Sequence, residues 1–352
     1  METNDNAATD SLLFMQSGKI NQISNATVTE SERVFMAEKE IAVSVICVTY
    51  NHEKYIRQAL DSILMQKTEF DFEVLIGEDC STDGTRAILK EYEADYPDVF
   101  RMYYRDENIG ATKNEYELFM NAKGKYIAAL ELDDIWTDEL KLQKQFAFLE
   151  AHPEYIGVSH DFDIIDKDGH VIENDDNQRI KHFFHKKFTF ADFMEYGFVF
   201  QTGTHFYRNI YNDGQDYTII YKAHTLIRDL TILSILLNRG DFYILPDTMS
   251  AYRRFFDTDA QNGRNVTVQN LAEDYCNTIR QVKMLYQYFD KKVDFSQKWN
   301  VLLTDYFKGM LKRVQPGFSW GTFLKLYFGS SPETKKKFRA GLMRSLVRRR
   351  RK

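Results

Sequence analysis

Hydrophobic and polar positions along residues 41–166 predict β-strands that alternate with α-helices. The first apolar run, IAVSVICV at Ile41–Val48, is rich in β-branched residues and suits a buried parallel strand. The next segment, Glu53–Gln66, places its apolar residues on one face, as an amphipathic helix does. Further strands are expected at Phe72–Ile76, Val99–Tyr104 and Tyr126–Leu130, and a second helix between the capping residues Ser81–Thr85 and Pro97. This alternation predicts a doubly wound α/β sheet, which binds its ligands beyond the carboxyl ends of the strands.

Polar and acidic residues follow three of the predicted strands directly. They are Thr-Tyr-Asn-His at 49–52, Glu-Asp-Cys-Ser at 78–81 and Glu-Leu-Asp-Asp at 131–134. Because the carboxyl ends of parallel strands meet at one edge of a sheet, we expect these three turns to form one site. The first strand is not followed by G-x-G-x-x-G, and G-x-x-x-x-G-K-[ST] does not occur in the sequence. The usual glycine-rich phosphate loops are therefore not supported.

The acidic turn Glu131–Asp134 has the composition of a divalent cation site. Carboxylates on a turn that leaves a buried strand can hold Mg²⁺ or Mn²⁺, and such an ion can also bridge substrate phosphates. A plainer interpretation is a solvated turn that caps the helix after Trp136. The two polar companion turns favour the metal and diphosphate site.

Together these segments resemble glycosyltransferase family 2, the inverting enzymes with the GT-A fold. The resemblance covers Val43–Arg253 and rests on four segments in the family's order: VSVICVTYNHEKYIRQALDSILMQ, IGEDCSTDGT, NIGATKN and GKYIAALELDDIWTDELKLQKQFAFLE. The last contains the metal motif in the form E-x-D-D-x-W, with Glu131 where the family usually has its first Asp. The resemblance implies a GT-A, Rossmann-like mixed sheet with a helical C-terminal extension.

The resemblance also implies a donor site. The residues expected there are Val48, Thr49, Tyr50, Asn51, Asp79, Lys113, Asn114, Glu131, Asp133 and Arg253. Asp79 would accept a hydrogen bond from a base imide, which favours UDP because a carboxylate needs an N–H donor. Asp133 is the expected metal ligand, and Glu131 would bind the metal, the ribose or both. The alternatives are a packing aromatic for Tyr50, a helix cap for Asp79 and an ordinary helix start for Lys113 and Asn114.

The acceptor side needs a base, because inversion by direct displacement requires a group that takes the proton from the attacking hydroxyl. Asp229, which precedes the apolar helix Leu230–Leu237, is expected to be this base. A helix start would keep its carboxylate ionised, and an ordinary N-cap is the alternative. Arg228 and Leu230 differ from the residues that commonly flank this acid in the family. The weaker candidates are Asp161 and Asp163 for acceptor or base contacts, and His205 and His224 for the acceptor cleft.

The segment MSAYRRF at residues 249–255 resembles the family's Y-R-x-H segment. Phe255 stands in place of the histidine, so a third metal ligand is not expected there. Arg253 or Arg254 is expected to grip the diphosphate, because a guanidinium pairs well with phosphate oxygens.

Charge is distributed unevenly along the chain. The formal net charge is −6, yet Lys335–Lys352 carries ten Lys and Arg and no acid, which leaves −16 on the rest. An acidic body argues against nucleic-acid binding, which needs a basic face on the folded domain. Phe338, Leu342 and Leu346 recur every four residues, and aromatic residues precede them at 318–328. This tail predicts a basic amphipathic helix for an anionic membrane surface, with a helix packed on the body as the alternative.

The cysteines Cys47, Cys80 and Cys276 are far apart and indicate neither a zinc site nor a disulfide framework, so a reducing compartment is expected. Apolar runs stay below the roughly 18–20 residues that span a bilayer. These features predict a cytoplasmic protein that is peripheral on the inner face of the cell membrane.

We expect three regions: a flexible arm at 1–38, a glycosyltransferase domain at 39–265 with nucleotide-sugar (39–135) and acceptor (136–265) halves, and a helical extension at 266–352. The expected reaction is metal-dependent transfer of a sugar from a nucleotide diphosphate sugar to a hydroxyl of a glycan or lipid-linked glycan, in bacterial surface polysaccharide assembly. One alternative is a catalytically silent scaffold that binds nucleotide sugars. Another is a nucleotidyltransferase, whose glycine-rich basic loop the sequence lacks. The pattern does not indicate an oligomeric state.

Overall fold

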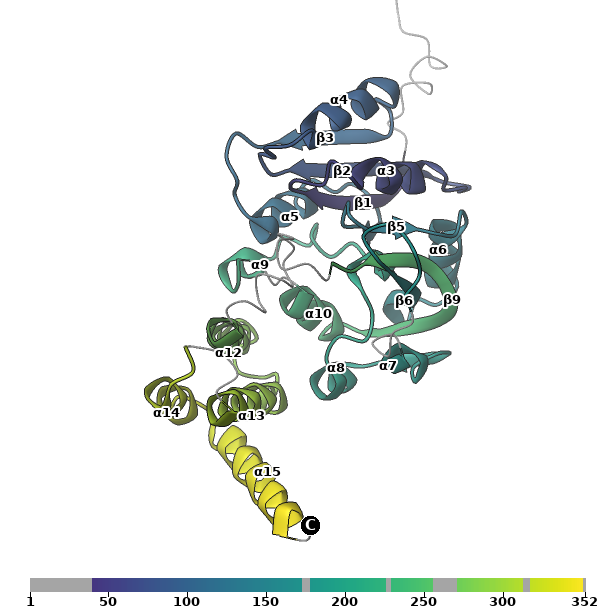
Figure 1. Ribbon diagram of the computed structural model, residues 1–352. Coiled ribbons are helices and arrows are strands. Elements are labelled where there is room, and N and C mark those ends of the chain that lie inside the picture. The colour runs from purple at the N-terminus through teal and green to yellow at the C-terminus, as the bar shows by residue number, and fades with distance from the viewer. Residues whose placement is uncertain (1–39, 173–177, 226–228, 256–270, 313–316, 351–352) are drawn as a thin grey trace, which may run out of the picture. The chain divides into compact units, whose positions relative to one another are not determined.

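The computed structural model describes residues 40–172, 178–225, 229–255, 271–312 and 317–350, with side chains up to residue 342 in the last helix. Residues 41–352 form one compact unit, shown in Figure 1. The arm predicted at 1–38 and the domain boundary predicted between 265 and 266 both lie outside the described residues.

A mixed sheet forms the centre of this unit. Within the described ranges it has nine strands, in the order β3-β2-β1-β4-β8-β6-β9-β5, with β7 paired to β9. The strands are β1 Ile41–Thr49, β2 Asp71–Glu78, β3 Phe100–Tyr104, β4 Tyr126–Ala129, β5 Ile135–Trp136, β6 Tyr155–Ile165, β7 Lys186–Phe188, β8 Phe206–Arg208 and β9 Asp241–Arg253. The first four run parallel, β8 is antiparallel to both of its neighbours, and β6 and β9 are parallel to each other. The predicted doubly wound mixed sheet is confirmed.

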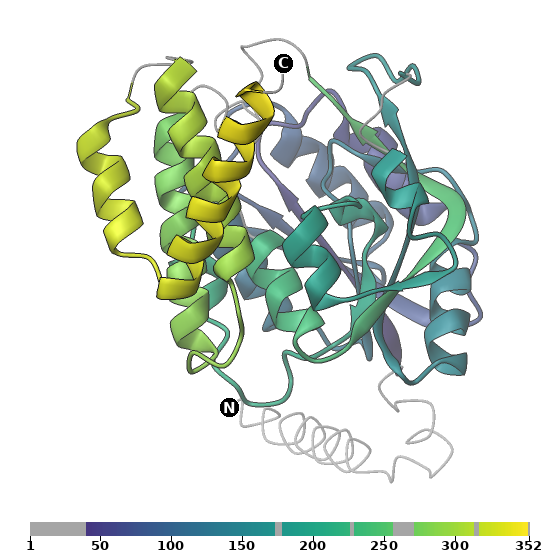
Figure 2. The same ribbon diagram turned by 90° about the horizontal axis from the view of Figure 1, so that it is seen from below.

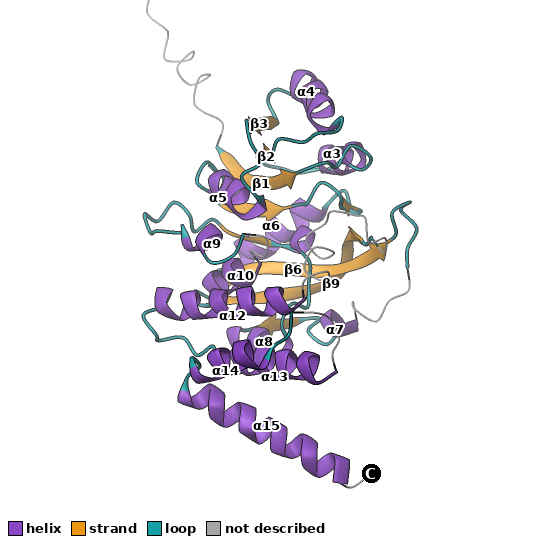
Figure 3. Ribbon diagram, turned by 60° about the vertical axis from the view of Figure 1, so that its left-hand side comes forward, coloured by secondary structure: helices purple, strands orange, loops and turns teal. Residues whose placement is uncertain are grey.

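Helices cover both faces of the sheet (Figure 3). On one face, Val43, Val45 and Cys47 of β1 pack with α3, α4 and α6, and on the other, Ile46 and Val48 belong to the core that contains α5, α8, α9 and α10. This division follows from the two-residue period of a strand, because a strand with apolar residues at both odd and even positions contributes to the cores on both faces. The helices are α3 Ile56–Leu64, α4 Thr85–Asp95, α5 Ala111–Phe119, α6 Lys141–Ala151, α7 Gln178–Lys181, α8 Phe190–Tyr196, α9 Ile219–Lys222 and α10 Asp229–Leu237, with the short 3₁₀ turn η2 at Thr202–Thr204.

The predicted helical C-terminal region is present as α12 Leu271–Tyr288, α13 Ser296–Lys312, α14 Trp320–Phe328 and α15 Pro332–Arg350 (Figures 1 and 2). Phe338 of α15 is buried, and its ring centroid lies 5.9 Å from that of Phe307 and 5.7 Å from that of Phe323. The start of the tail is therefore packed on its neighbours, as in the alternative interpretation. Leu346 lies outside the described side chains. Among the described residues, we find no helix with the length and apolarity that a membrane span requires.

Candidate active site

The turns after β1 and β2 lie side by side and are bonded to each other. The N–H of Asp79 donates to the carbonyl of Thr49 at 3.0 Å. The N–H of Asn51 donates to Ser81 Oγ at 3.0 Å, and Asn51 Oδ1 accepts a bond from the N–H of Thr82 at 2.8 Å. These three bonds join the first two predicted polar turns into one rigid edge.

Two residues of this edge adopt the left-handed backbone conformation. Asn51 has φ 58° and Cys80 has φ 63°. Residues other than glycine seldom adopt such angles, and they keep them where the surroundings hold the backbone in place. Of the other residues predicted to bind the donor here, Val48 and Thr49 are buried, and Tyr50 is half-buried at the end of β1.

Asp79 caps the start of α5. Its Oδ1 accepts a bond from the N–H of Ile109 at 2.8 Å and its Oδ2 one from the N–H of Gly110 at 3.0 Å. Burial raises the pKa of the Asp79 carboxyl, and the two N–H groups partly offset this rise. Each oxygen keeps a lone pair, so the cap leaves the predicted contact with a nucleotide base chemically possible.

Asn114 anchors α5 to the sheet. It is fully buried, its Nδ2 donates to the carbonyl of Gly77 at 2.8 Å, and its Oδ1 accepts a bond from Arg105 Nε at 3.0 Å. The geometry therefore favours a framework role for Asn114 over the predicted contact with the donor. Lys113, one position earlier in the first turn of α5, is exposed and could reach a ligand.

The acidic turn after β4 brings three carboxylates together. Oxygens of Glu131, Asp133 and Asp134 all lie within 4.8 Å of one another. Asp133 and Asp134 are buried, which contradicts the alternative of a solvated turn. Burial raises the pKa of Asp133, an effect that His52 opposes and Glu131 reinforces, and burial together with Asp133 and Glu131 raises the pKa of Asp134 well above its ordinary value. A group of hard oxygen donors under mutual repulsion is the ligand set that Mg²⁺ and Mn²⁺ prefer.

Arg253, the last residue of β9, holds this turn through several hydrogen bonds. Its backbone N–H donates to Asp134 Oδ1 at 2.7 Å, and its Nε donates to the carbonyl of Asp133 at 2.8 Å. Its Nη2 donates to Gln58 Oε1 at 3.0 Å, and the guanidinium carbon lies 4.7 Å from the ring centroid of Tyr55. Arg253 is 1% exposed. The geometry thus favours Arg253 as a clamp on the acidic turn over the predicted grip on the diphosphate.

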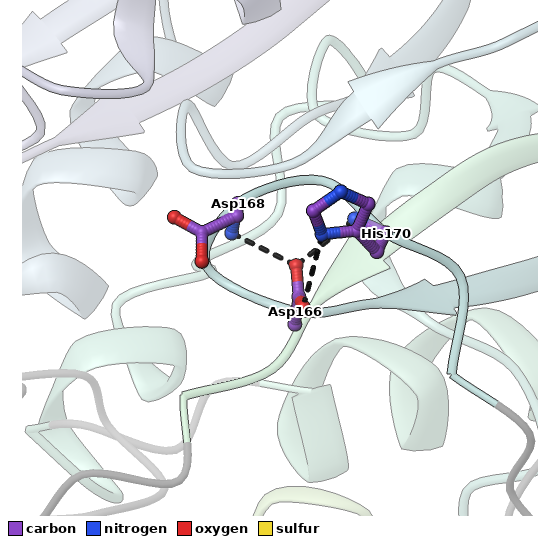
Figure 4. Close-up of side chains that lie close together, drawn as sticks. All are labelled: Asp166, Asp168 and His170. Carbon is purple, nitrogen blue, oxygen red and sulfur yellow. Dashed lines mark hydrogen bonds and ion pairs between the residues drawn. The ribbon is translucent and has the colours of Figure 1, made fainter.

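A turn at residues 166–170, which the sequence analysis did not single out, borders the clamp. Nη1 of Arg253 donates to the carbonyls of Asp166 and Lys167 at 3.1 and 3.2 Å. Figure 4 shows that the Asp166 carboxylate lies between Asp168 and His170, and it accepts bonds from their N–H groups at 2.8 and 2.9 Å. These bonds explain the arrangement of the three side chains as a self-capped turn. An Asp-x-Asp-Gly pattern after a strand was the available signal.

Asp229, the predicted base, is the first residue of α10 and is linked to the acidic turn through η2. Thr202 Oγ1 donates to Asp229 Oδ1 at 3.4 Å. The next residue, Gly203, accepts a bond from Trp136 Nε1 at 3.0 Å, and a Cβ on it would lie 3.4 Å from Leu130. Leu130 and Trp136 flank residues 131–134 in the sequence, so η2 lies beside the turn that they border.

The segment before Asp229 approaches the start of α5. The hydroxyl of Thr112 donates to the carbonyl of Thr225 at 3.2 Å. Residues 226–228 lie outside the described ranges. Thr225, the last described residue before Asp229, thus lies next to the start of α5.

The weaker candidates are strand residues or buried histidines. Asp161 and Asp163 belong to β6, where they pair with Thr248 and with Ala251 of β9. His205 and His224 are buried. The N–H of Arg254 donates to the carbonyl of Ile165 at 2.8 Å.

Part of the chain that contains this site is similar to a known protein family. Residues 44–215 match the profile of the family described as Glycosyl transferase family 2. This stretch, which is similar to the family over about half of the chain, is called the family 2 domain below. The domain contains the three polar turns and η2, while Asp229 and Arg253 follow it in the chain.

Relatives of the family 2 domain occur in several bacteria. The chain is 46% identical to the uncharacterized protein Rv1520 of Mycobacterium tuberculosis over 127 residues, which are 36% of this chain and 37% of Rv1520. It is 40% identical over 107 residues to TuaG of Bacillus subtilis, named as a proposed teichuronic acid biosynthesis glycosyltransferase, with 30% of this chain and 41% of TuaG covered. The chain therefore matches well under half of the length of these relatives.

A solved structure has the same fold. The chain is similar to S. aureus TarS, residues 1–349, in complex with UDP-GlcNAc, with a TM-score of 0.54 and 17% sequence identity over 85% of this chain and 78% of that chain. The likeness shows that the chain has a GT-A-like fold, as the sequence resemblance implied.

Proposed function

We propose that the chain is an inverting glycosyltransferase that moves a sugar from a nucleotide diphosphate sugar, with UDP as the nucleotide, to an acceptor hydroxyl. The observation that carries the proposal is the position of the acidic turn 131–134 beside the turn of β1, which is itself bonded to the turn of β2. The N–H of Leu130 donates to the carbonyl of Ile46 on β1, and His52 of the β1 turn acts on the pKa of Asp133. The carboxylate of Asp79 at this edge, and the fold likeness to a protein solved with UDP-GlcNAc, support uridine as the base.

Asp133 and Glu131 are the proposed ligands of Mg²⁺ or Mn²⁺. Their oxygens lie close together, and Arg253 holds the backbone of the turn that carries them. When bound, the ion would offset the negative charge that develops on the leaving diphosphate. Val48, Thr49, Tyr50, Asn51 and Lys113 are the proposed contacts of the nucleotide and its phosphates.

Asp229 is the proposed general base. As the first residue of α10 it faces the positive end of the helix dipole, which keeps a carboxylate ionised. The hydroxyl of Thr202 donates to it and limits its rotation. An ionised, oriented carboxylate can accept the proton of an acceptor hydroxyl as that oxygen attacks the sugar.

The acceptor that we propose is a glycan or lipid-linked glycan of a bacterial surface polysaccharide, used by a cytoplasmic enzyme at the inner face of the cell membrane. The name of TuaG, which concerns teichuronic acid biosynthesis, supports a polysaccharide acceptor. The ten basic residues in Lys335–Lys352 support attachment to an anionic membrane surface.

The proposal is tested by UDP release from a panel of UDP-sugars, with and without Mn²⁺, for the parent chain and two variants. We expect Asp133→Asn to lose the Mn²⁺-dependent rate and Asp229→Asn to lower kcat by about a hundredfold or more while the chain still binds UDP. Glu139→Gln is the matched control, because Glu139 forms a surface ion pair with Lys67 and should leave the rate unchanged.

Three results would contradict the proposal. Binding of UDP-sugars by the parent without turnover of any donor would favour the silent scaffold. Turnover of nucleoside triphosphates would favour a nucleotidyltransferase. Full activity of Asp229→Asn would remove Asp229 as the base.

A further inference from the structure

Helix α14 exposes a stripe of large apolar side chains. Trp320, Leu324 and Phe328 are 56%, 44% and 68% exposed. Residues four apart lie above one another on a helix, so these three side chains form one continuous line along α14. Single exposed apolar residues are common on protein surfaces, whereas a contiguous row of three, including a tryptophan, marks a contact surface. We call this row the α14 stripe.

The opposite side of α14 is packed on the protein. Phe323 is buried, and its ring centroid lies 5.2 Å from that of Phe307 on α13. A helix with apolar residues on both its packed and its outer face needs an apolar environment on the outside as well. In Figures 1 and 2, α14 lies at the outer edge of the C-terminal helices.

The apolar surface extends from α14 onto α13. Leu311 is 59% exposed. It follows Phe307 by one helical turn, and the ring centroid of Phe307 lies 6.0 Å from that of Trp320.

Basic groups stand directly beside the stripe. Lys335 Nζ donates to the carbonyl of Phe328 at 3.1 Å, and Arg339 Nε donates to the hydroxyl of Tyr327 at 2.8 Å. Lys325 is exposed on α14 itself. The first turn of α15 carries one acid, Glu333, and the chain beyond it has ten Lys and Arg without an acid. An aromatic and aliphatic row beside cationic groups is complementary to a bilayer with anionic headgroups, in which the apolar side chains enter and the cations pair with phosphate.

We propose that the α14 stripe, with Leu311, is the surface by which the chain contacts an anionic phospholipid membrane. This inference refines the peripheral location in the proposed function, and it moves the contact from α15 to α14. The sequence analysis placed Phe338 on the membrane face, but the structure buries that residue against Phe307 and Phe323. In this arrangement the basic residues of α15 attract the anionic headgroups, and the apolar side chains of α14 insert into the bilayer.

The three tryptophans offer a direct test with the full chain. Trp136 and Trp299 are buried, while Trp320 is exposed on the stripe. Vesicles of phosphatidylcholine containing about a third phosphatidylglycerol should shift the tryptophan emission to shorter wavelength and lower its quenching by acrylamide, because Trp320 leaves water. Vesicles of phosphatidylcholine alone should cause at most a small change. No donor or acceptor is present, so the result does not depend on transferase activity.

Variants separate the stripe from the rest of the surface. Leu324→Gln with Phe328→Gln keeps Trp320 as the reporter and should weaken partitioning to anionic vesicles at least tenfold. Val301→Gln is the control. Val301 is an exposed apolar residue of α13 that points about a third of a turn around the helix axis from Phe307, so this variant should bind like the parent. Circular dichroism of each variant confirms that the helices are retained.

Four outcomes would overturn the proposal. They are an unchanged emission spectrum with anionic vesicles, equal partitioning to neutral vesicles, equal partitioning of the stripe variant and the parent, and a dimer in light scattering that the stripe variant abolishes. The last would assign the surface to a second copy of the chain.

Discussion

Asp133 and Asp134 are neighbours in the sequence but have different surroundings. Asp134 Oδ1 accepts a bond from the backbone N–H of Arg253. For Asp133, the neighbouring His52 lowers the pKa and Glu131 raises it. Asp134 therefore fixes the turn, and Asp133 remains the proposed metal ligand. The hydrogen bonds from Arg253 hold this turn from outside the motif, because Arg253 lies more than a hundred residues later in the chain.

The clamp predicts that Arg253 controls metal affinity from behind the turn. Arg253→Lys keeps one positive charge but cannot reproduce the bonds of the planar guanidinium, so we expect Mn²⁺ to bind about tenfold more weakly. Isothermal titration of the variant with Mn²⁺ measures this. Arg57→Lys on α3, where Arg57 forms an exposed ion pair with Glu91, is the control. A lower melting temperature with unchanged Mn²⁺ affinity would show that Arg253 is merely structural.

Lys141 carries a buried amine that the proposed mechanism does not use. Its Nζ lies 4.2 Å from the ring centroid of Trp136 and donates to Gln145 Oε1 at 2.8 Å. Burial lowers the pKa of Lys141 well below its ordinary value near 10.5. The unfolded chain therefore holds this proton more tightly than the folded chain does, and the folded state gains stability as pH rises toward 10.5.

This difference in pKa predicts a pH dependence of stability. Relative to Lys141→Met, the parent should gain about 1.4 kcal/mol of unfolding free energy per pH unit within the window between the folded and unfolded pKa values. Urea unfolding of both proteins at several pH values between 7 and about 10 measures the gap between their free energies of unfolding. The contributions of other titrating groups cancel in this difference. A gap that stays constant with pH would contradict the lowered pKa.

Contacts between residues that are near in the chain could be expected from the sequence, and contacts between distant residues could not. The polar turns and the acidic motif follow strands directly, so their convergence followed from sheet geometry alone. Arg253 meets Gln58 across 195 residues, and the turn at 166–170 meets Arg253 across more than 80. A one-dimensional pattern does not encode such contacts, which explains why Arg253 was expected at the diphosphate. Asn114 was similarly expected at the ligand because its burial depends on a glycine 37 residues earlier.

At the scale of elements, α5 is anchored to β2 because the side chain of Asn114 fills the space beside Gly77. A Cβ on Gly77 would lie 2.2 Å from Asn114 Oδ1, which is far below van der Waals contact. The absence of a side chain at Gly77 thus makes room for the amide that anchors α5. The helix whose start carries Lys113 and meets Asp79 is positioned by this contact.

The interlock predicts a specific coupling. Gly77→Ala should destabilise the protein by about 2 kcal/mol, because the amide of Asn114 must move and lose its bonds. Adding Asn114→Ala should recover part of this loss, so the double-mutant cycle in urea should show a favourable interaction between the two changes. Gly321→Ala in α14 is the control, since a Cβ there meets nothing within 4 Å, and it should change stability by less than about 1 kcal/mol. Additive effects would contradict the interlock.

Long, strongly patterned elements were predicted well from the sequence, and short ones were not. The observed β1, α4 and α10 agree with their predicted segments within about three residues, whereas β5, β7 and β8, with two or three residues each, were not predicted. Such short strands form because a neighbouring strand offers hydrogen-bonding groups, so their signal lies outside their own residues. Helix α3 begins at Ile56 and not at Glu53, because the N–H groups of Tyr55 and Ile56 both bond to the carbonyl of His52 in a tight turn.

At the scale of the whole molecule, one hydrophobic core extends from the sheet to the last helix. The same cluster contains Ile46 of β1, Leu118 of α5, Leu233 of α10, Leu303 of α13 and Phe338 of α15. The predicted extension is therefore packed as part of the compact unit 41–352. Deleting residues 318–352 would remove Phe338 from this core along with the α14 stripe, so substitutions test the membrane contact more cleanly.

Because the core is shared, we expect the chain to unfold in one transition, and a substitution in the last helix should lower the midpoint of that whole transition. Phe338→Ala should reduce the free energy of unfolding by about 3 kcal/mol, because it leaves a cavity between α13, α14 and α15. Near-ultraviolet and far-ultraviolet circular dichroism should show the same shifted midpoint. The exposed residue Arg339 offers a control, since Arg339→Ala should shift the midpoint far less. Two separate transitions would show that the helices fold independently.

The bond between Asp134 and Arg253 also sets an order on the folding of the chain. It closes a loop of 119 residues, whereas the bonds between the turns of β1 and β2 close loops of about thirty. Contacts between distant residues are formed late, because the entropy of closing a long loop must be overcome first. On a ribosome, the acidic turn would emerge more than a hundred residues before its clamp. The nucleotide edge can thus take shape early in synthesis, and the metal turn acquires its final geometry only when β9 has been added to the sheet.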